Sequence, residues 1–217
     1  MRVLLCLARF MDILNVEIQL RSLYPQIERV LEAEPSSTTL CSDTFDIHTE
    51  DRTLVNMFLR FLRPKCRLVI YSSGISESQK TFLQTPFFDS DVVRAARDMY
   101  IHVETRITDS QITKLQAPVL RIQSPYLSAW SINKLILQWL DGKRKITFIQ
   151  VRATRDLPRN EVFQGIDPAA LITGTEASDG RGYNPSLYTL VRSDHGDLVV
   201  YLDTDYCNIS DPFQYSH

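Results

Sequence analysis

Apolar residues recur along this chain with two alternating periods, one typical of helices and the other typical of strands. The clearest helical stretch has its apolar residues at i, i+3, i+4, i+7 and i+8, which places one stripe on a helix: Ile132, Leu135, Ile136, Trp139 and Leu140. Asp141 and Gly142 are expected to end this helix, because Gly readily takes the left-handed conformation of a helix C-cap. Residues 146–151 then have the composition of a strand.

The same two patterns alternate in the part of the chain that precedes this helix and strand. Strands are expected at residues 16–20, 40–48, 67–71, 99–103 and 118–122. Helices are expected at residues 1–14, 25–34, 51–62, 76–83 and 89–97, with a helical turn at 108–115. The chain therefore reads as a succession of short strands and helices.

After residue 171 the pattern changes to turns and strands without a helix. Residues 173–182 are rich in Gly and polar residues and are expected to form an exposed loop. Two strands, 187–192 and 198–203, are expected to form a hairpin, with Gly196 in the turn where a positive φ is needed. Residues from 206 onward are expected to fray.

The expected strands near residues 68, 100, 119 and 147 lie 32, 19 and 28 residues apart. This spacing fits one strand–helix unit per repeat, as in leucine-rich solenoids, although the strict leucine and asparagine ladder is missing. We therefore expect an α/β fold, an irregular leucine-rich-repeat-like strand–helix solenoid with a C-terminal β-hairpin. A single open α/β sheet explains the periodicity equally well. Residues 1–35 would be the first unit of the domain, 36–205 its repeats and 206–217 a flexible tail.

Composition and charge narrow the classes of partner. The chain has 217 residues, of which 44% are hydrophobic and 23% charged, as in ordinary globular proteins. A net charge of −2 argues against nucleic acid, and the run 143–145 of three cations is expected to be a solvated helix end. No apolar run approaches the roughly 20 residues of a membrane span, and Arg9 interrupts the one that resembles a secretory signal. We expect no nucleic-acid or membrane partner and a cytoplasmic or nuclear location.

The four cysteines are too scattered to suggest a disulfide framework or a zinc site: Cys6, Cys41, Cys66 and Cys207. They are expected to be buried thiols in a reducing compartment. The sequon at residues 208–210 is a match that a chain of this length often contains by chance.

Candidate catalytic residues are few. Two histidines have carboxylates beside them in the sequence: His48 with Glu50 and Asp51, and His195 with Asp194 and Asp197. Neighbourhood in sequence does not make the geometry of a general base, so we expect His48 at a strand end or helix cap and His195 in a turn. His102 is expected on the solvated face of a strand.

Other residues that could carry a site also have structural explanations. Asp203 and Asp205 are two carboxylates in a turn, too few ligands for a cation. Trp139 lies on the apolar stripe and is expected in the core, whereas Trp130 lies off it and is expected to be partly buried. The motifs GxSxG, HExxH and GxGxxG and the P-loop are missing. We expect no enzyme, cofactor or metal; the alternative is a small α/β hydrolase or transferase whose site joins residues distant in sequence.

Five segments resemble parts of the F-box-associated domain of the large nematode F-box protein families. Residues 131–142 (SINKLILQWLDG) resemble its helix pattern dlN-flk-W-i-G, and residues 161–166 (EVFQGI) resemble the turn ending in Gly-Ile that follows the next strand. Residues 182–184 (GYN) and 191–196 (VRSDHG) are similar to its terminal gY-i-R-dG hairpin. Residues 11–18 (MDILNVEI) resemble the segment after the F-box linker, and the likeness is best over residues 101–202.

The resemblance implies a non-enzymatic module that recruits a target protein for ubiquitination by a cullin–RING ligase. In those families an F-box precedes the domain and docks the Skp1 adaptor. Residues 1–14 are too short to form an F-box. A Skp1-like adaptor and a cullin are therefore implied only if a full-length form carries an F-box, and a target protein is the partner that the resemblance implies directly.

Overall fold

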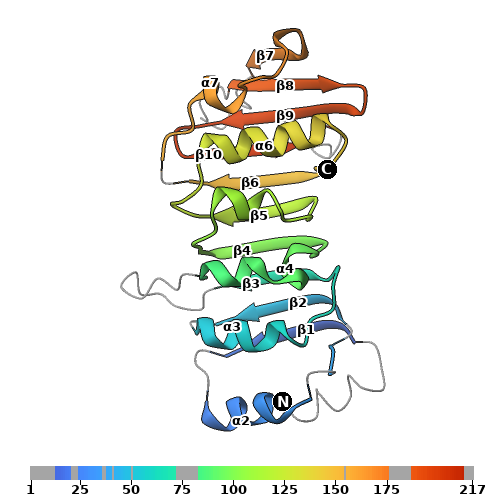
Figure 1. Cartoon of the computed structure of the whole chain (residues 1–217), viewed down its shortest axis with the longest axis vertical. Helices are drawn as coiled ribbons and strands as arrows, with labels where there is room; N and C mark the ends of the chain where they lie inside the picture. The colour runs from blue at the N-terminus through green and yellow to red at the C-terminus, as the bar shows by residue number, and fades with distance from the viewer. Residues whose placement is uncertain are drawn as a thin grey trace, which may run out of the picture.

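The computed structural model describes residues 13–20, 24–35, 38–40, 42–49, 51–71, 83–153, 155–175 and 187–212, which form a mixed α/β fold on one open sheet (Figure 1). The strands are β1 (Ile13–Gln19), β2 (Ser42–His48), β3 (Arg67–Tyr71), β4 (Asp98–Glu104), β5 (Val119–Gln123), β6 (Phe148–Arg152), β7 (Leu171–Thr175), β8 (Leu187–Ser193), β9 (Gly196–Leu202) and β10 (Tyr206–Ser210). The helices are α2 (Pro25–Ala33), α3 (Arg52–Leu59), α4 (Asp91–Arg94), α5 (Asp109–Ile112), α6 (Ala129–Leu140) and α7 (Arg159–Val162), with 3-10 turns η2 (Thr85–Asp89) and η3 (Pro168–Ala170).

The ten strands follow the order β1-β2-β3-β4-β5-β6-β10-β9-β8-β7. From β1 to β6 each strand pairs in parallel with the next strand of the chain. The chain then crosses to the far edge, where β7 begins an antiparallel meander that returns through β8 and β9 to β10, which pairs with β6. The sheet thus joins a parallel part and an antiparallel part.

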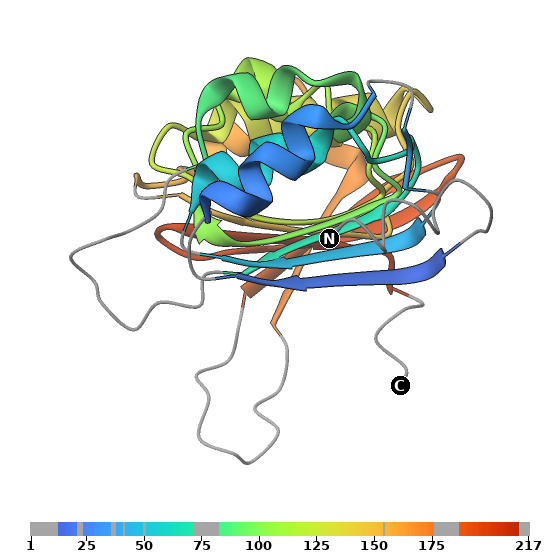
Figure 2. The same ribbon diagram turned by 90° about the horizontal axis from the view of Figure 1, so that it is seen from below.

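The helices of the described chain lie on one face of this sheet and leave the other face uncovered (Figure 2). Side chains along a strand point alternately to the two faces, and β4 shows the consequence. Met99, Ile101 and Val103 are buried under the helices, whereas His102 between them is exposed on the open face. The hydrophobic core is therefore a layer between sheet and helices. None of the described helices is long and apolar enough to cross a membrane.

Helix α6 confirms the expected apolar stripe. Ile132, Leu135 and Ile136 are fully buried, and Trp139 is only 8% exposed. The helix ends at Leu140 as expected: Gly142 has φ +67° and its N–H donates to the Trp139 carbonyl, while Lys143 N–H donates to the Gln138 carbonyl. These two bonds form a Schellman motif, which requires the left-handed residue that Gly supplies.

Asn133 joins α6 to the α7 turn. Its side chain is 6% exposed, and Nδ2 donates to the carbonyl oxygens of Val162 (2.9 Å) and Gln164 (2.8 Å). Gly165 follows with φ +75°, which turns the chain immediately after the bonded carbonyl. One buried amide therefore fixes the turn that leads from β6 toward the antiparallel part of the sheet.

Most of the expected elements are confirmed within the described residues, and several bounds change. The expected strands at 16–20, 40–48, 67–71, 99–103 and 118–122 are β1 to β5, and the expected hairpin is β8 and β9 around Gly196, whose φ is +130°. The expected helix at 89–97 shortens to α4, because Asp89 ends η2 and residues 95–97 form the turn that leads into β4. Of the expected helix at 1–14, residues 13 and 14 instead belong to β1, because they pair with β2, and residues 1–12 lie outside the described residues. Residues 76–82 of another expected helix also lie outside them.

Two expectations about the C-terminal part are wrong. Residues 173–175, expected in a loop, extend β7, because their backbone pairs with residues 187–189 of β8. Residues 206–210, expected to begin a flexible tail, form β10, in which Cys207 and Ile209 are fully buried. The strand is short and half polar, so its sequence gives only a weak strand pattern, and pairing with β6 and β9 determines its conformation.

The cation run at residues 143–145 is only partly a solvated helix end. Lys143 is exposed and pairs with Asp141 at 2.7 Å, but Arg144 is only 7% exposed. Its guanidinium donates to Gln138 Oε1 (3.4 Å) and to the Ala117 carbonyl (3.5 Å). Burial lowers the pKa of Arg144 to about 10 because desolvation penalises the charged form.

Replacing Trp139 with Ala tests the position of α6. The side chain is buried in the layer between α6 and the sheet, so Trp139→Ala should lower the free energy of unfolding by about 3–5 kcal/mol. Urea denaturation followed by circular dichroism measures this. A loss below about 1 kcal/mol, the size of an ordinary surface substitution or little more, would contradict the position of this helix.

Replacing Asn133 tests the link between α6 and α7. Asn133→Ala removes the amide group that donates hydrogen bonds to the carbonyl oxygens of Val162 and Gln164. We therefore expect the free energy of unfolding to fall by about 1–3 kcal/mol. Lys134→Ala, one position along the same helix and part-exposed, is the matched control and should change stability by less than about 0.5 kcal/mol. Equal effects of the two substitutions would show that the Asn133 hydrogen bonds do not stabilise the fold.

Candidate binding face

Three rings stack across neighbouring strands on the open face of the sheet. His48 on β2 stacks on Tyr71 of β3, with ring centroids 4.6 Å apart and planes at 18°. Tyr71 stacks in turn on His102 of β4, at 4.4 Å and 8°. Parallel register brings the rings together, because His48 and Tyr71 are direct cross-strand partners. We call His48, Tyr71 and His102 the aromatic ladder.

The fold gives His48 partners that its sequence neighbours do not predict. His48 Nε2 lies 3.8 Å from Glu17 Oε1 on β1, and both side chains are partly exposed. Asp51 instead caps helix α3, where its carboxylate accepts a hydrogen bond from Thr53 N at 2.9 Å. Glu50 lies outside the described residues. His48 is thus at a strand end, as expected, and the described residue Asp51 serves the helix cap.

A pocket of about 320 Å³ lies on the open face where the aromatic ladder ends. Four strands of the sheet, β4, β5, β6 and β10, supply its lining residues: Ile101, His102, Arg121, Ile122, Gln123, Gln150, Arg152 and Tyr206. It spans the junction between the parallel and antiparallel parts of the sheet. We call it the open-face pocket.

Arg121 belongs to the lining of this pocket and lies on β5, between β4 and β6. It is the register partner of Gln150 on β6, and its Nε is buried without a hydrogen-bond partner among the described residues. Partial desolvation lowers the pKa of the neighbouring His102, and the positive charge of Arg121 adds to this shift. His102 is exposed, but its stacking on Tyr71 explains why it is partly removed from water.

Two further contacts fix the far rim of the pocket. Gln150 Nε2 donates to the Tyr206 hydroxyl at 2.5 Å, which joins β6 to β10. Arg152 Nε lies 3.8 Å from Asp205 Oδ2 in the turn before β10.

The other carboxylate of this turn, Asp203, accepts a hydrogen bond from Thr204 N at 2.7 Å. Among the described residues no group of three His, Cys, Asp or Glu side chains could hold a metal ion.

Aromatic residues continue on the same face beyond the pocket. Tyr201 on β9 and Tyr188 on β8 are cross-strand partners with ring centroids 6.0 Å apart. Gly174 on β7 faces Tyr188, and a Cβ at this position would clash with the tyrosine ring. On the same face but on the other side of the pocket, the Arg67 guanidinium of β3 lies 4.7 Å from the centroid of the Tyr100 ring of β4. The open face therefore combines aromatic surface with a cationic pocket at its middle.

The polar lining of the open-face pocket consists mainly of hydrogen-bond donors. Guanidinium groups, side-chain amides and a phenol form its polar lining, which suits a polar or negatively charged group. A hydrolase would need a histidine within reach of both a carboxylate and a nucleophile. The lining residues include no Asp, Glu, Ser or Cys. Among the described lining residues, His102 therefore has no carboxylate, serine or cysteine beside it in the pocket.

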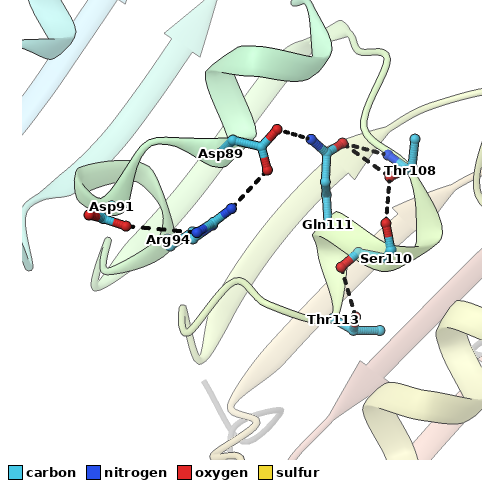
Figure 3. Close-up of polar contacts among 7 residues, drawn as sticks. All are labelled: Asp89, Asp91, Arg94, Thr108, Ser110, Gln111 and Thr113. Atoms are coloured by element: carbon cyan, nitrogen blue, oxygen red, sulfur yellow. Dashed lines mark hydrogen bonds and ion pairs between the residues drawn. The ribbon is translucent and has the colours of Figure 1, made fainter.

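A second polar cluster lies on the helix-bearing side and joins α4 to α5 (Figure 3). Asp89 accepts hydrogen bonds from Arg94 (2.8 Å) and from Gln111 Nε2 (2.9 Å). Gln111 Oε1 also accepts from the backbone N–H of Thr108 (3.1 Å), as part of the capping box of α5. The members of the cluster bind one another, so it stabilises the short helices that cover β4 and β5.

The remaining candidates take structural positions. Trp139 is in the core, as expected, and Trp130 is 48% exposed, with Lys134 Nζ 5.6 Å from its ring centroid. His195 lies in the β8–β9 turn, as expected, where its N–H donates to Ser193 Oγ at 3.1 Å. Its ring lies beside Gly142, since a Cβ there would be 3.2 Å from His195 Nε2.

Two of the four cysteines belong to the described residues. Cys66 and Cys207 are free and buried, as expected, and burial raises the pKa of both thiols. Cys6 and Cys41 lie outside the described residues.

Sequence reasoning missed most residues of the pocket. Arg121 in VLRIQ and Gln150 in FIQVR alternate with buried apolar residues, which predicts their common face but not their register. Tyr206 falls in the expected tail, so the sequence does not predict that it lines the pocket.

Comparison of the chain with protein-family models, with curated protein sequences and with solved structures gives no match in any of the three.

Replacing Arg121 should change the titration of His102. Arg121→Gln removes a positive charge that disfavours the imidazolium, so the pKa of His102 should rise, while desolvation keeps it below the usual value near 6.5. NMR titration of the imidazole measures the shift. Arg67→Gln is the matched control on the same face, and equal shifts in both variants would show that Arg121 does not act on His102.

The titration of His102 also has a consequence for stability. The pKa of His102 is lower in the folded state than in the unfolded state. As the pH falls from about 6.5 through the lowered pKa, the unfolded state therefore binds more protons than the folded state. The contribution of His102 to stability is therefore present above about pH 6.5 and is lost through this window. His102→Gln should flatten this part of the stability–pH curve.

Proposed function

We propose that this chain is a protein-interaction module that binds a target protein on the open face of its sheet. One observation supports the proposal most strongly: helices cover one face of the sheet, while the other presents the aromatic ladder and a cationic pocket. Aromatic and Arg side chains are enriched at the energetically important positions of protein interfaces. An uncovered sheet face that carries them is well suited to a partner protein.

We further propose that strands β1 to β6 with their helices are an irregular solenoid of the leucine-rich type. These strands begin at residues 13, 42, 67, 98, 119 and 148, at intervals of 29, 25, 31, 21 and 29 residues. Parallel neighbours in sequence order, with helices on one side, support this proposal. Solenoids use the extended face that their repeats build as a binding surface.

The resemblance to the F-box-associated domain extends the proposal to ubiquitination. Its pattern residues Asn133, Trp139 and Gly142 have distinct structural tasks in α6, namely the link to α7, the core and the helix end. Residues with such structural roles are ones that proteins sharing this fold would retain. On this proposal the module recruits a target protein for a cullin–RING ligase, and a Skp1-like adaptor and a cullin would join it through an F-box in a longer form.

Affinity purification of open-face variants tests the proposal. The tagged full chain, Tyr71→Ala and Trp130→Ala would be expressed in cells of the source organism, and bound proteins quantified by mass spectrometry. Tyr71 is the middle ring of the aromatic ladder, and Trp130 is an exposed aromatic residue on the helix-bearing side. We expect at least one protein that Trp130→Ala retains and Tyr71→Ala reduces about tenfold, a loss of about 1.4 kcal/mol.

A folding control and the set of recovered proteins make the result decisive. Thermal unfolding must show that both variants are folded at the temperature of the experiment. Equal recovery of every bound protein with Tyr71→Ala and with the unchanged chain would contradict the open face as the binding surface. Recovery of cullin and Skp1-like subunits would support the role in ubiquitination, and their absence beside an open-face-dependent partner would contradict that part alone.

A further inference from the structure

The open-face pocket has an excess of positive charge at its centre. Arg121 and Arg152 are the two cations of its lining, and no carboxylate belongs to that lining. Asp205 lies 3.8 Å from Arg152 and partly offsets its charge. No described carboxylate forms an ion pair with Arg121, and its Nε is buried without a hydrogen-bond partner among the described residues. One guanidinium in the pocket is therefore left without a counter-charge.

The groups around Arg121 favour a planar acceptor. Gln123 on the same strand and Gln150 on the neighbouring strand place amide groups in the lining. Guanidinium and amide N–H groups donate hydrogen bonds, and a guanidinium matches a carboxylate through two parallel bonds. His102 is biased toward its neutral form, so it adds little positive charge near neutral pH. The pocket is thus suited to a single negative charge.

The surroundings of the pocket favour an extended protein segment as the source of that charge. The aromatic ladder leads to His102 at one rim, and Tyr206 stands at the other. Aromatic surface on both sides can pack against the residues that precede and follow a bound side chain. A volume of about 320 Å³ is at the lower end of the range for binding pockets and accommodates one side chain.

We propose that the open-face pocket binds the carboxylate of a Glu or Asp side chain in an extended, aromatic-flanked segment of the partner protein, with Arg121 as the principal donor. This inference rests on the proposed function and names the chemistry that its binding face recognises. A phosphate dianion would require both guanidinium groups, and Asp205 already faces Arg152. The single uncompensated charge of Arg121 matches a carboxylate better.

NMR of the full chain with 15N-labelled arginine tests the inference through the Nε–H signals of Arg121 and Arg152. Three capped peptides serve as probes: Gly-Tyr-Glu-Tyr-Gly, the same peptide with Gln in place of Glu, and the same peptide with phosphoserine there. We expect saturable shifts of the Arg121 signal with the Glu peptide, in the millimolar range of a single short contact. The Gln peptide should bind about tenfold more weakly or not at all.

Variants distinguish pocket binding from general attraction to the face. Arg121→Gln should abolish the response of the Arg152 signal to the Glu peptide, whereas Arg67→Gln, which removes an exposed cation from the same face, should leave it unchanged. Loss of binding in both variants would overturn the assignment to the pocket. Equal binding of the Glu and Gln peptides, or no shift with either, would also overturn it.

The phosphoserine peptide decides the class of anion. Binding about tenfold tighter than the Glu peptide would overturn the carboxylate in favour of a phosphate. These failures differ from a failure of the proposed function, which the Tyr71→Ala purification measures without reference to Arg121. A partner that depends on Tyr71 would stand even if the peptide experiment contradicts the carboxylate.

Discussion

The pairing of β10 with both β6 and β9 is the interaction on which the rest of the structure depends. β6 is the last of six parallel strands, and β7, β8 and β9 form a meander that begins at the far edge. Among the strands that the structure describes, only β10 pairs with a strand of each part. Its apolar residues Cys207 and Ile209 are fully buried in the core layer, and Tyr206 reaches the open face, where it bonds Gln150. The same five residues therefore hold the sheet together and complete the pocket.

One-sided coverage of the sheet follows from the alternation of its strands. On β4 the inward positions Met99, Ile101 and Val103 pack under the helices, and His102 between them lies on the face that no described helix covers. Parallel register then brings His48, Tyr71 and His102 into one stack, although they are separated by more than twenty residues in the chain. The proposed binding face is thus built from outward residues of successive strands, which no short sequence motif marks.

How much of this the sequence predicts depends on whether the signal is local. The stripe that ends at Trp139 and Leu140 and the stop at Gly142 depend on neighbours within one or two turns, so the sequence predicts the buried face of α6 and its end. Register is non-local, so nothing in VLRIQ or FIQVR states that Arg121 lies opposite Gln150. β10 is half polar and short, and Arg144 looks like part of a solvated cation run although it is buried. Tertiary pairing and packing decided these positions, and the pocket consists largely of such residues.

Hydrogen–deuterium exchange of the full chain tests the central claim most directly, since it measures whether residues 206–210 are a strand or a tail. Amides that are hydrogen-bonded inside a sheet exchange only when the structure opens. We expect the amides of β10 to exchange as slowly as those of β6, its partner in the sheet. Exchange of residues 206–210 at the rate of an unstructured peptide, while β6 remains protected, would contradict the joined sheet and the pocket that it completes.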